Sequence, residues 1–182
     1  YLLTQHGHNK TNKCSVFHYK FILYEDVAAS YVFYIKEKSM QAIILAAGMG
    51  KRLGELTQNN TKCMVKVHQQ TLIERMLAQL SRLNLERIIL VIGYKGEKVK
   101  ELVGNKIGHT PILYIENPVY DKTNNIYSLY LAKNYLIEDD TLLLESDLIF
   151  SNAILSKLIN NPYPNLAVVA KYQSWMDGTV VR

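Results

Sequence analysis

The stretch Gln41–Lys66 reads QAIILAAGMGKRLGELTQNNTKCMVK, and it decides the fold of the chain. It begins with an apolar run of strand length, Ala42–Leu45, and passes directly into a loop of small residues that contains Gly48 and Gly50. Backbone N–H groups in such a loop can approach an anion that larger side chains would push away. We therefore predict a buried strand followed by a phosphate-binding loop.

Three cations follow the glycines: Lys51 and Arg52 come directly after them, and Lys62 comes ten residues after Arg52. Cations beside a nest of backbone N–H groups are what a bound triphosphate requires. The loop lacks the third glycine of the dinucleotide-binding fingerprint and the Gly-Lys-Ser/Thr ending of a P-loop. The alternative is a plain glycine turn followed by solvated surface cations.

Composition and charge narrow the class of protein. The 182 residues are enough for one α/β domain with its own core, and 48% hydrophobic residues with 20% charged residues is a globular balance. The formal charge of +5 is spread along the chain without a basic stripe of interleaved aromatics, which favours anionic small molecules over nucleic acid. Cys14 and Cys63 have no metal-ligand spacing, and no apolar run reaches the roughly 18 residues that span a bilayer. We expect a cytoplasmic protein without a membrane partner.

The first 39 residues are rich in tyrosine and histidine and show no sustained periodicity. One hypothesis is that they are not native or not ordered, because Lys36-Glu37 ahead of Met40 can be read as a translated ribosome-binding site before a start codon. The alternative is a short strand and helix, built from Phe21–Tyr24 and Val27–Ile35, that pack on the main domain. We therefore divide the chain into an N-terminal extension, 1–39, and a main domain, 40–182.

From Gln41 onward, apolar runs of strand length alternate with segments of helical period, which predicts a three-layer α/β/α, Rossmann-like fold with a mainly parallel sheet. Thr71 and Glu74 form a capping box ahead of one helix, and further helices are expected over Lys95–Val103, from Asn124 or Asn125, and from Ser151. The expected strands are Ala42–Leu45, Arg87–Ile92, Ile112–Ile115, Thr141–Leu144 and Leu166–Ala170.

Asp147 lies just beyond the carboxyl end of the predicted strand Thr141–Leu144, where open α/β sheets bind their ligands. A carboxylate that faces a bound triphosphate is a suitable Mg²⁺ ligand, because Mg²⁺ prefers oxygen donors and keeps phosphate oxygens and waters in its shell. Strand alternation turns Glu145 to the same side, as a helper or as the partner of a cation. The alternative for Asp147 is a turn or helix-cap residue.

Six ordered motifs carry a resemblance to a known family. The chain resembles the LicC-like enzymes of the nucleotidyltransferase superfamily, which activate phosphocholine with CTP, over nearly all of Met40–Arg182. The motif NNIYSL and the triplet ESD are closer to the cytidylyl branch than to sugar-phosphate enzymes, which usually show a Gly-Thr-Ala type motif at this place. Members of the family continue further and take a second metal-binding aspartate from their later half, so the resemblance implies a C-terminally truncated chain. The motifs are AIILAAGMGKRL, TKCMVKV, TLIERML, VIGY, NNIYSL and ESD.

The resemblance also implies roles for residues. Arg52 would hold the β and γ phosphates, Lys62 would face the α-phosphate, and Asp147 would carry Mg²⁺, so these three are the catalytic candidates. By the same resemblance, Asn125 and Ser128 of NNIYSL, at the first turn of a helix, would read the pyrimidine or bind phosphate, and helix capping is the alternative. The implied nucleotide-binding residues are Leu45, Ala46, Ala47, Gly48, Met49, Gly50, Lys51, Arg52, Asn125 and Ser128.

The segment after the last predicted strand contains the only tryptophan, Trp175, beside Tyr172 and Asp177. An aromatic face next to an acid suits a quaternary ammonium group, so these residues are candidates for the acceptor site. Packing, or a surface for a partner, is the alternative.

These observations predict transfer of a cytidylyl group from CTP to phosphocholine, or to a similar amino-alcohol phosphate or aminophosphonate, with release of pyrophosphate and with Mg²⁺ as cofactor. One alternative is a sugar-1-phosphate nucleotidyltransferase. Another is a nucleotide-binding or regulatory module without catalysis, which the truncation favours. Homo-oligomerisation is left open.

Overall fold

The computed structural model describes residues 39–169, with the side chains of Lys51 and Arg52 excepted. The chain falls into two compact units, 1–149 and 150–182, and each is described by itself. The extension before Ser39 and the acceptor candidates Tyr172, Trp175 and Asp177 lie outside the described residues, so the predictions made for them stay predictions.

A five-stranded sheet in the order β5-β6-β4-β1-β7 forms the centre of the first unit. Strand β1 pairs in parallel with β4 on one side and with β7 on the other, and β6 continues the parallel set beyond β4. Only the short β5 runs antiparallel, against β6. The mainly parallel sheet predicted from the sequence is confirmed. The strand bounds are β1 Met40–Ala46, β4 Arg87–Ile92, β5 Lys106–Ile107, β6 Thr110–Glu116 and β7 Asp140–Glu145.

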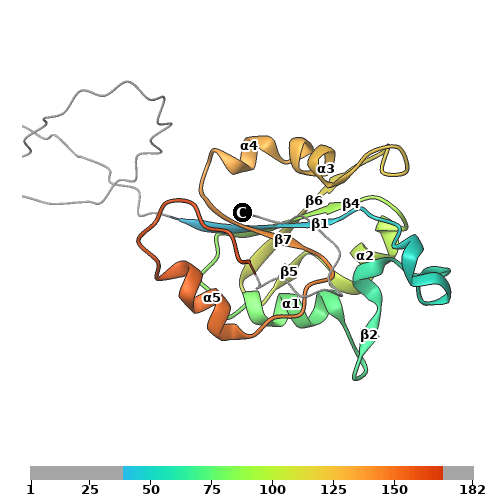
Figure 1. Ribbon diagram of the computed structural model, residues 1–182, viewed down its shortest axis with the longest axis horizontal. Coiled ribbons are helices and arrows are strands. Elements are labelled where there is room, and N and C mark those ends of the chain that lie inside the picture. Colours follow the sequence, from blue (N-terminus) through green and yellow to red (C-terminus); the bar gives the residue numbers. More distant parts are fainter. Residues whose placement is uncertain (1–38, 170–182) are drawn as a thin grey trace, which may run out of the picture. The chain divides into compact units, whose positions relative to one another are not determined.

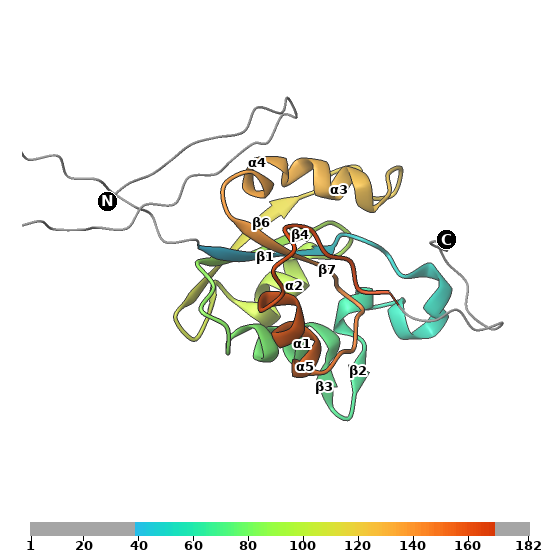
Figure 2. The same ribbon diagram turned by 60° about the vertical axis from the view of Figure 1, so that its left-hand side comes forward.

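Helices cover both faces of this sheet (Figure 1). The helices α1 and α2 lie on one face and α3 and α4 on the other, and the turned view shows the same arrangement (Figure 2). The three-layer α/β/α architecture is therefore confirmed. The helix bounds are α1 Leu72–Leu80, α2 Gly96–Val103, α3 Asn125–Leu131 and α4 Lys133–Leu136.

Two short 3₁₀ helices and a small hairpin connect β1 to α1. They are η1 Lys51–Thr57, η2 Lys62–Met64, and the antiparallel pair β2 Lys66–Val67 and β3 Gln70–Thr71.

The core lies on both sides of β1 and β4, whose apolar residues are buried almost without interruption. Such continuous burial is typical of parallel strands that are covered on both faces. Ile43 and Leu45 of β1 belong to a cluster against which Leu129 of α3 and Tyr135 of α4 pack. Because side chains alternate along a strand, Ala42 and Ile44 face the opposite layer of helices.

Helix α1 begins as the sequence predicts. The Thr71 hydroxyl accepts a hydrogen bond from the Glu74 backbone N–H at 3.2 Å, and a Glu74 carboxylate oxygen accepts one from the Thr71 backbone N–H at 2.9 Å. The Thr71 hydroxyl also donates to the Glu74 carboxylate at 2.6 Å, and this hydrogen bond, followed by the one from the Thr71 backbone N–H, lowers the pKa of Glu74 because both favour its ionised form. The buried face of the helix has the expected period, with Leu72, Ile73, Met76, Leu77 and Leu80.

In the second unit, α5 spans Asn152–Ile159 and starts after Ser151, as expected. The strand predicted at Leu166–Ala170 is wrong over its described residues, 166–169, which are irregular and exposed. An apolar run becomes a strand only where another strand pairs with it, and no described strand pairs with this one.

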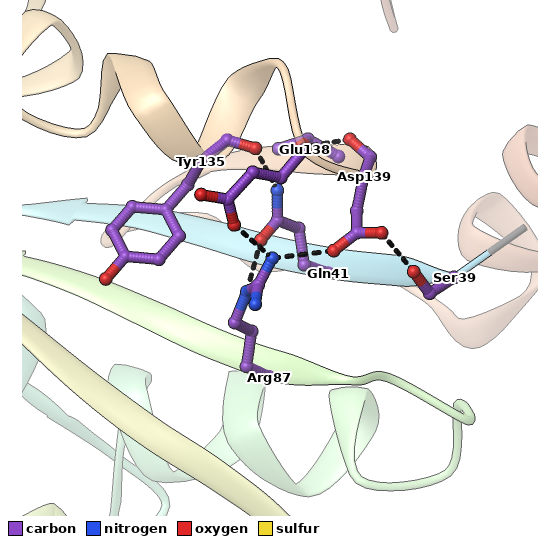
Figure 3. Close-up of polar contacts among 7 residues, drawn as sticks. Ser39, Gln41, Arg87, Tyr135, Glu138 and Asp139 are labelled. Atoms are coloured by element: carbon purple, nitrogen blue, oxygen red, sulfur yellow. Dashed lines mark hydrogen bonds and ion pairs between the residues drawn. The ribbon is translucent and has the colours of Figure 1, made fainter. Parts of the chain in front are cut away.

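A polar network joins the amino-terminal ends of the central strands (Figure 3). Arg87 at the start of β4 donates to Gln41 of β1 at 2.8 Å, to Glu138 at 2.7 Å and to Asp139 at 2.6 Å. The Asp139 side chain is 1% exposed and also accepts a hydrogen bond from Ser39. The guanidinium therefore neutralises a buried carboxylate just before β7.

Replacing Arg87 by methionine should destabilise the fold, because it removes the cation from the buried Asp139 carboxylate. We expect a loss of about 3–5 kcal/mol in the free energy of unfolding, measured by denaturant titration. Arg75→Met, at an exposed position of α1, is the matched control and should change stability by less than about 0.5 kcal/mol. Equal losses in the two variants would contradict the assignment.

Candidate functional site

The carboxyl ends of four parallel strands meet at one edge of the sheet. The register places Leu45 of β1 beside Glu145 of β7, and Ala46 of β1 beside Ile92 of β4. Glu116, the last residue of β6, pairs with Ile92 in turn. The loops that follow these strands are therefore neighbours, although they lie far apart in the sequence.

The glycine loop after β1 is held against the residue that the sequence singles out as catalytic. Gly50 adopts a left-handed conformation with φ 69°, and a β-carbon at Gly50 would lie 3.0 Å from the Lys62 Cβ. The buried Thr57 hydroxyl donates to the Gly50 carbonyl oxygen at 3.0 Å. Glycine is thus required here both for backbone conformation and for close approach.

The predicted nucleotide-binding residues of this loop differ in what they can offer a ligand. Leu45, Ala46 and Ala47 are buried, so their backbone is the part that could reach a nucleotide. Gly48 is exposed, and a β-carbon there would meet no atom within 4 Å. Open space beside Gly48 agrees with the predicted anion-binding loop.

Met49 is partly buried and lines a cavity of about 270 Å³ together with Gly54, Thr57, Gln58 and Tyr94. Lys51 and Arg52 open helix η1, and the expected contact of Arg52 with phosphates stays a prediction because its side chain lies outside the described part.

Lys62 and Asp147 form an ion pair across the edge of the sheet. Lys62 begins η2, and Asp147 follows β7 by two residues, as the sequence predicts. Their side chains are 35% and 31% exposed, so both are accessible from solvent. The backbone N–H of Ser146 donates to the Leu45 carbonyl oxygen at 3.2 Å, which ties the turn that carries Asp147 to β1.

Glu145 accepts hydrogen bonds from the side chain of Asn125, the first residue of α3. The Asn125 Nδ2 lies 2.9 Å from each Glu145 carboxylate oxygen. Burial raises the pKa of Glu145, and the nearby Asp147 carboxylate raises it further, whereas the Asn125 hydrogen bond and Lys62 lower it. The side chain of Asn125 thus faces β7 instead of capping α3, and Asn124 holds the N-cap position.

Ser128 is brought near the site but faces the interior. It is 3% exposed, and its hydroxyl accepts a hydrogen bond from Asn117 at 3.1 Å. Asn117, itself buried, also donates to Thr123 and accepts from the Val119 backbone. Ser128 therefore supports the loop that follows β6, and direct contact of Ser128 with a nucleotide stays a prediction.

Sequence reasoning gave no role to the loop after β4, although it supports the glycine loop directly. The Tyr94 backbone N–H donates to the Ala47 carbonyl oxygen at 3.2 Å. Lys95 donates to the Gln58 carbonyl oxygen at 2.6 Å, and so holds the segment that leads to Lys62. The signal that could have found this loop is Gly93 directly after a buried strand, within the motif VIGY.

The described residues contain no group of three or more His, Cys, Asp or Glu side chains that could hold a metal ion. Asp147 offers hard oxygen donors from a partly exposed side chain, whereas both carboxylate oxygens of Glu145 accept from Asn125. The Asp147 carboxylate fits Mg²⁺, because this ion is usually bound by one or two carboxylates together with phosphate oxygens and waters. Within residues 39–169, no helix has the length and apolar character that crossing a membrane requires.

Comparison with known proteins identifies the fold family. Residues 42–179 match the MobA-like NTP transferase domain. The chain belongs to the MobA-like NTP transferase family. The LicC-like resemblance is also confirmed: the solved CTP:phosphocholine cytidylyltransferase LicC of Streptococcus pneumoniae is 36% identical with a TM-score of 0.52, over 63% of this chain and 48% of that chain.

Two curated relatives illustrate the range of this NTP transferase family. A CMP-5'-(3-aminopropyl)phosphonate synthase from Streptomyces rubellomurinus is 34% identical over 143 residues, which cover 79% of this chain and 23% of the relative. A choline-phosphate cytidylyltransferase from Streptococcus pneumoniae is 37% identical over 115 residues, which cover 59% of this chain and 47% of the relative. The chain thus spans less than half the length of either relative.

Gly93→Ala should destabilise the fold, because the new β-carbon would lie 2.9 Å from the Ala47 carbonyl oxygen and 2.7 Å from the Tyr120 Cβ. We expect a loss of about 1–3 kcal/mol in the free energy of unfolding. Gly48→Ala is the control, since its β-carbon has open space, and it should change stability by less than about 0.5 kcal/mol. If the Gly93→Ala variant is as stable as wild type, the loop after β4 does not pack closely against the glycine loop.

Proposed function

We propose that the protein transfers a cytidylyl group from CTP to a small phosphate or phosphonate acceptor that carries an amino or quaternary ammonium group, such as phosphocholine. The observation that carries the proposal is the Lys62–Asp147 ion pair beside an open glycine loop. The names of the relatives support the choice of CTP and of the acceptor class, because one is a choline-phosphate cytidylyltransferase and the other makes a CMP-linked aminopropylphosphonate.

In this reaction an acceptor oxygen attacks the α-phosphorus of CTP. A new P–O bond forms, the bond between the α-phosphorus and the bridging oxygen breaks, and pyrophosphate leaves with the electron pair. Attacking oxygen and phosphorus are both in anionic groups, so the main task of the protein is to hold them in line and to neutralise charge.

Lys62 would supply a positive charge at the α-phosphate, because its Cβ lies against Gly50 of the glycine loop and its side chain is partly exposed. To do so, it has to leave Asp147. The vacated carboxylate could then hold Mg²⁺, which when bound would neutralise phosphate charge. Backbone N–H groups near Gly48, and Arg52 by resemblance, would hold the remaining phosphates.

The same exchange argues for binding of nucleotide and metal together. After they separate, Lys62 would lie beside a phosphate and Asp147 beside Mg²⁺, so each would keep a neighbour of opposite charge.

A cytoplasmic setting suits this chemistry and the free thiol of Cys63, which is buried.

A pyrophosphate-release assay tests the proposal. The four NTPs are each paired with phosphocholine, 2-aminoethylphosphonate and glucose 1-phosphate, in the presence of Mg²⁺. We expect release with CTP and one of the amino acceptors. Release only with glucose 1-phosphate would favour a sugar-1-phosphate nucleotidyltransferase, and nucleotide binding without release from any pair would favour a regulatory module; either result would contradict the proposal.

Lys62→Ala should lower kcat by about 100-fold or more, because it removes the positive charge proposed to face the α-phosphate. The fold should remain intact, since the Lys62–Asp147 pair is partly exposed and contributes little to stability. Lys66→Ala, at an exposed position four residues later, is the matched control and should keep wild-type turnover. Wild-type kcat in the Lys62 variant would refute the role.

A further inference from the structure

The side-chain amide of Asn125 is held in one orientation by Glu145. Its Nδ2 lies 2.9 Å from both carboxylate oxygens, and two equal contacts to one NH₂ group fit a carboxylate that acts only as an acceptor. The reversed amide would place the Asn125 carbonyl oxygen against this carboxylate, with two acceptors facing each other. Glu145 therefore determines which end of the amide points away from β7.

The opposite end of the amide, Oδ1, is available to a ligand. Asn125 is exposed, and within residues 39–169 no donor contacts its Oδ1. Glu145, which holds the amide, is close enough to Lys62 and Asp147 for their charges to act on it. A hydrogen-bond acceptor of fixed orientation thus stands beside the proposed reaction centre.

We propose that Glu145 is a positioning residue: by turning the Asn125 carbonyl oxygen toward the bound base, it makes the site select cytosine over uracil. The inference rests on the proposed function, since it concerns the nucleotide of that reaction. Cytosine carries an amino group at position 4, which can donate to Oδ1. Uracil carries an oxygen there, which would leave two acceptors in contact.

A site built around a fixed hydrogen bond discriminates strongly against an analogue that cannot make it, because a polar group of the site is left without a partner. If the Asn125 amide could turn, its NH₂ group would donate to the oxygen at position 4 of uracil as readily as its carbonyl oxygen accepts from the amino group of cytosine. Discrimination therefore depends on Glu145 and not on Asn125 alone.

Glu145→Gln tests this dependence with little change in shape. The glutamine amide can both donate and accept, so it allows either orientation of Asn125. The full protein is titrated with CTP and with UTP, each with Mg²⁺, and the ratio of the two Kd values is measured by calorimetry. We expect wild type to bind CTP more tightly by about tenfold or more, and Glu145→Gln to bring the ratio to within about threefold of unity.

Two further variants separate orientation from general damage. Glu145→Asp keeps an acceptor-only carboxylate and should restore part of the CTP preference. Glu116→Gln makes the same substitution at the last residue of the neighbouring strand β6, where the carboxylate pairs with Lys100, and should leave the ratio unchanged. A merely structural role of Glu145 would weaken CTP and UTP alike and would not move the ratio.

The outcomes for the inference and for the proposed function can be told apart. A wild-type preference for CTP that persists in a folded Glu145→Gln protein would overturn the inference alone, as would equal affinity of wild type for CTP and UTP. Failure of wild type to bind either nucleotide would overturn the proposed function, and the inference with it. If Glu145→Gln does not fold, Asn125→Ser removes the carbonyl oxygen directly, and a retained CTP preference there would also overturn the inference.

Discussion

The position of β1 in the middle of a parallel sheet is the constraint on which the structure of the first unit depends. The strand is buried along almost its whole length and pairs on both sides, with β4 and with β7. Parallel pairing brings the carboxyl ends of these strands to one edge. The glycine loop, the Gly93 loop, Glu145 and Asp147 meet there because the parallel register aligns the ends of β1, β4 and β7.

At that edge the structure joins opposite charges that the proposed reaction would separate. Lys62 and Asp147 neutralise each other as an ion pair. An anionic nucleotide and a cation, arriving together, would offer each partner a replacement. Nucleotide or cation alone would bind less tightly, because either one would leave Asp147 or Lys62 without its counter-charge. Under the proposed function, the Lys62–Asp147 pair would therefore favour joint binding of nucleotide and metal.

Much of the first unit could be predicted from the sequence, because its strands are long apolar runs and its helix starts carry local signals. Arg87–Ile92 has the predicted bounds, and Thr71 with Glu74 forms the predicted capping box. Asp147 was placed correctly because its position depends only on where β7 ends. The strand at Leu166–Ala170 was wrong over its described residues because strand formation depends on a partner that no local pattern reveals.

The missed contacts are those between segments distant in the sequence. Nothing in the local pattern of Asn125 indicates that its amide meets Glu145 instead of capping α3. Likewise, position 93 has no room for a β-carbon, because the Ala47 carbonyl oxygen and Tyr120 approach it from two other loops. The hydrogen bond from the buried Asn117 to Ser128 is likewise visible only in the fold.

A crystal structure of the full protein with CTP and Mg²⁺ tests the account most directly. The account predicts a triphosphate against the loop Gly48–Gly50, Lys62 turned to the α-phosphate, and Asp147 separated from Lys62 and bound to the metal. An intact Lys62–Asp147 pair beneath a bound nucleotide, or a nucleotide bound away from this edge, would contradict it.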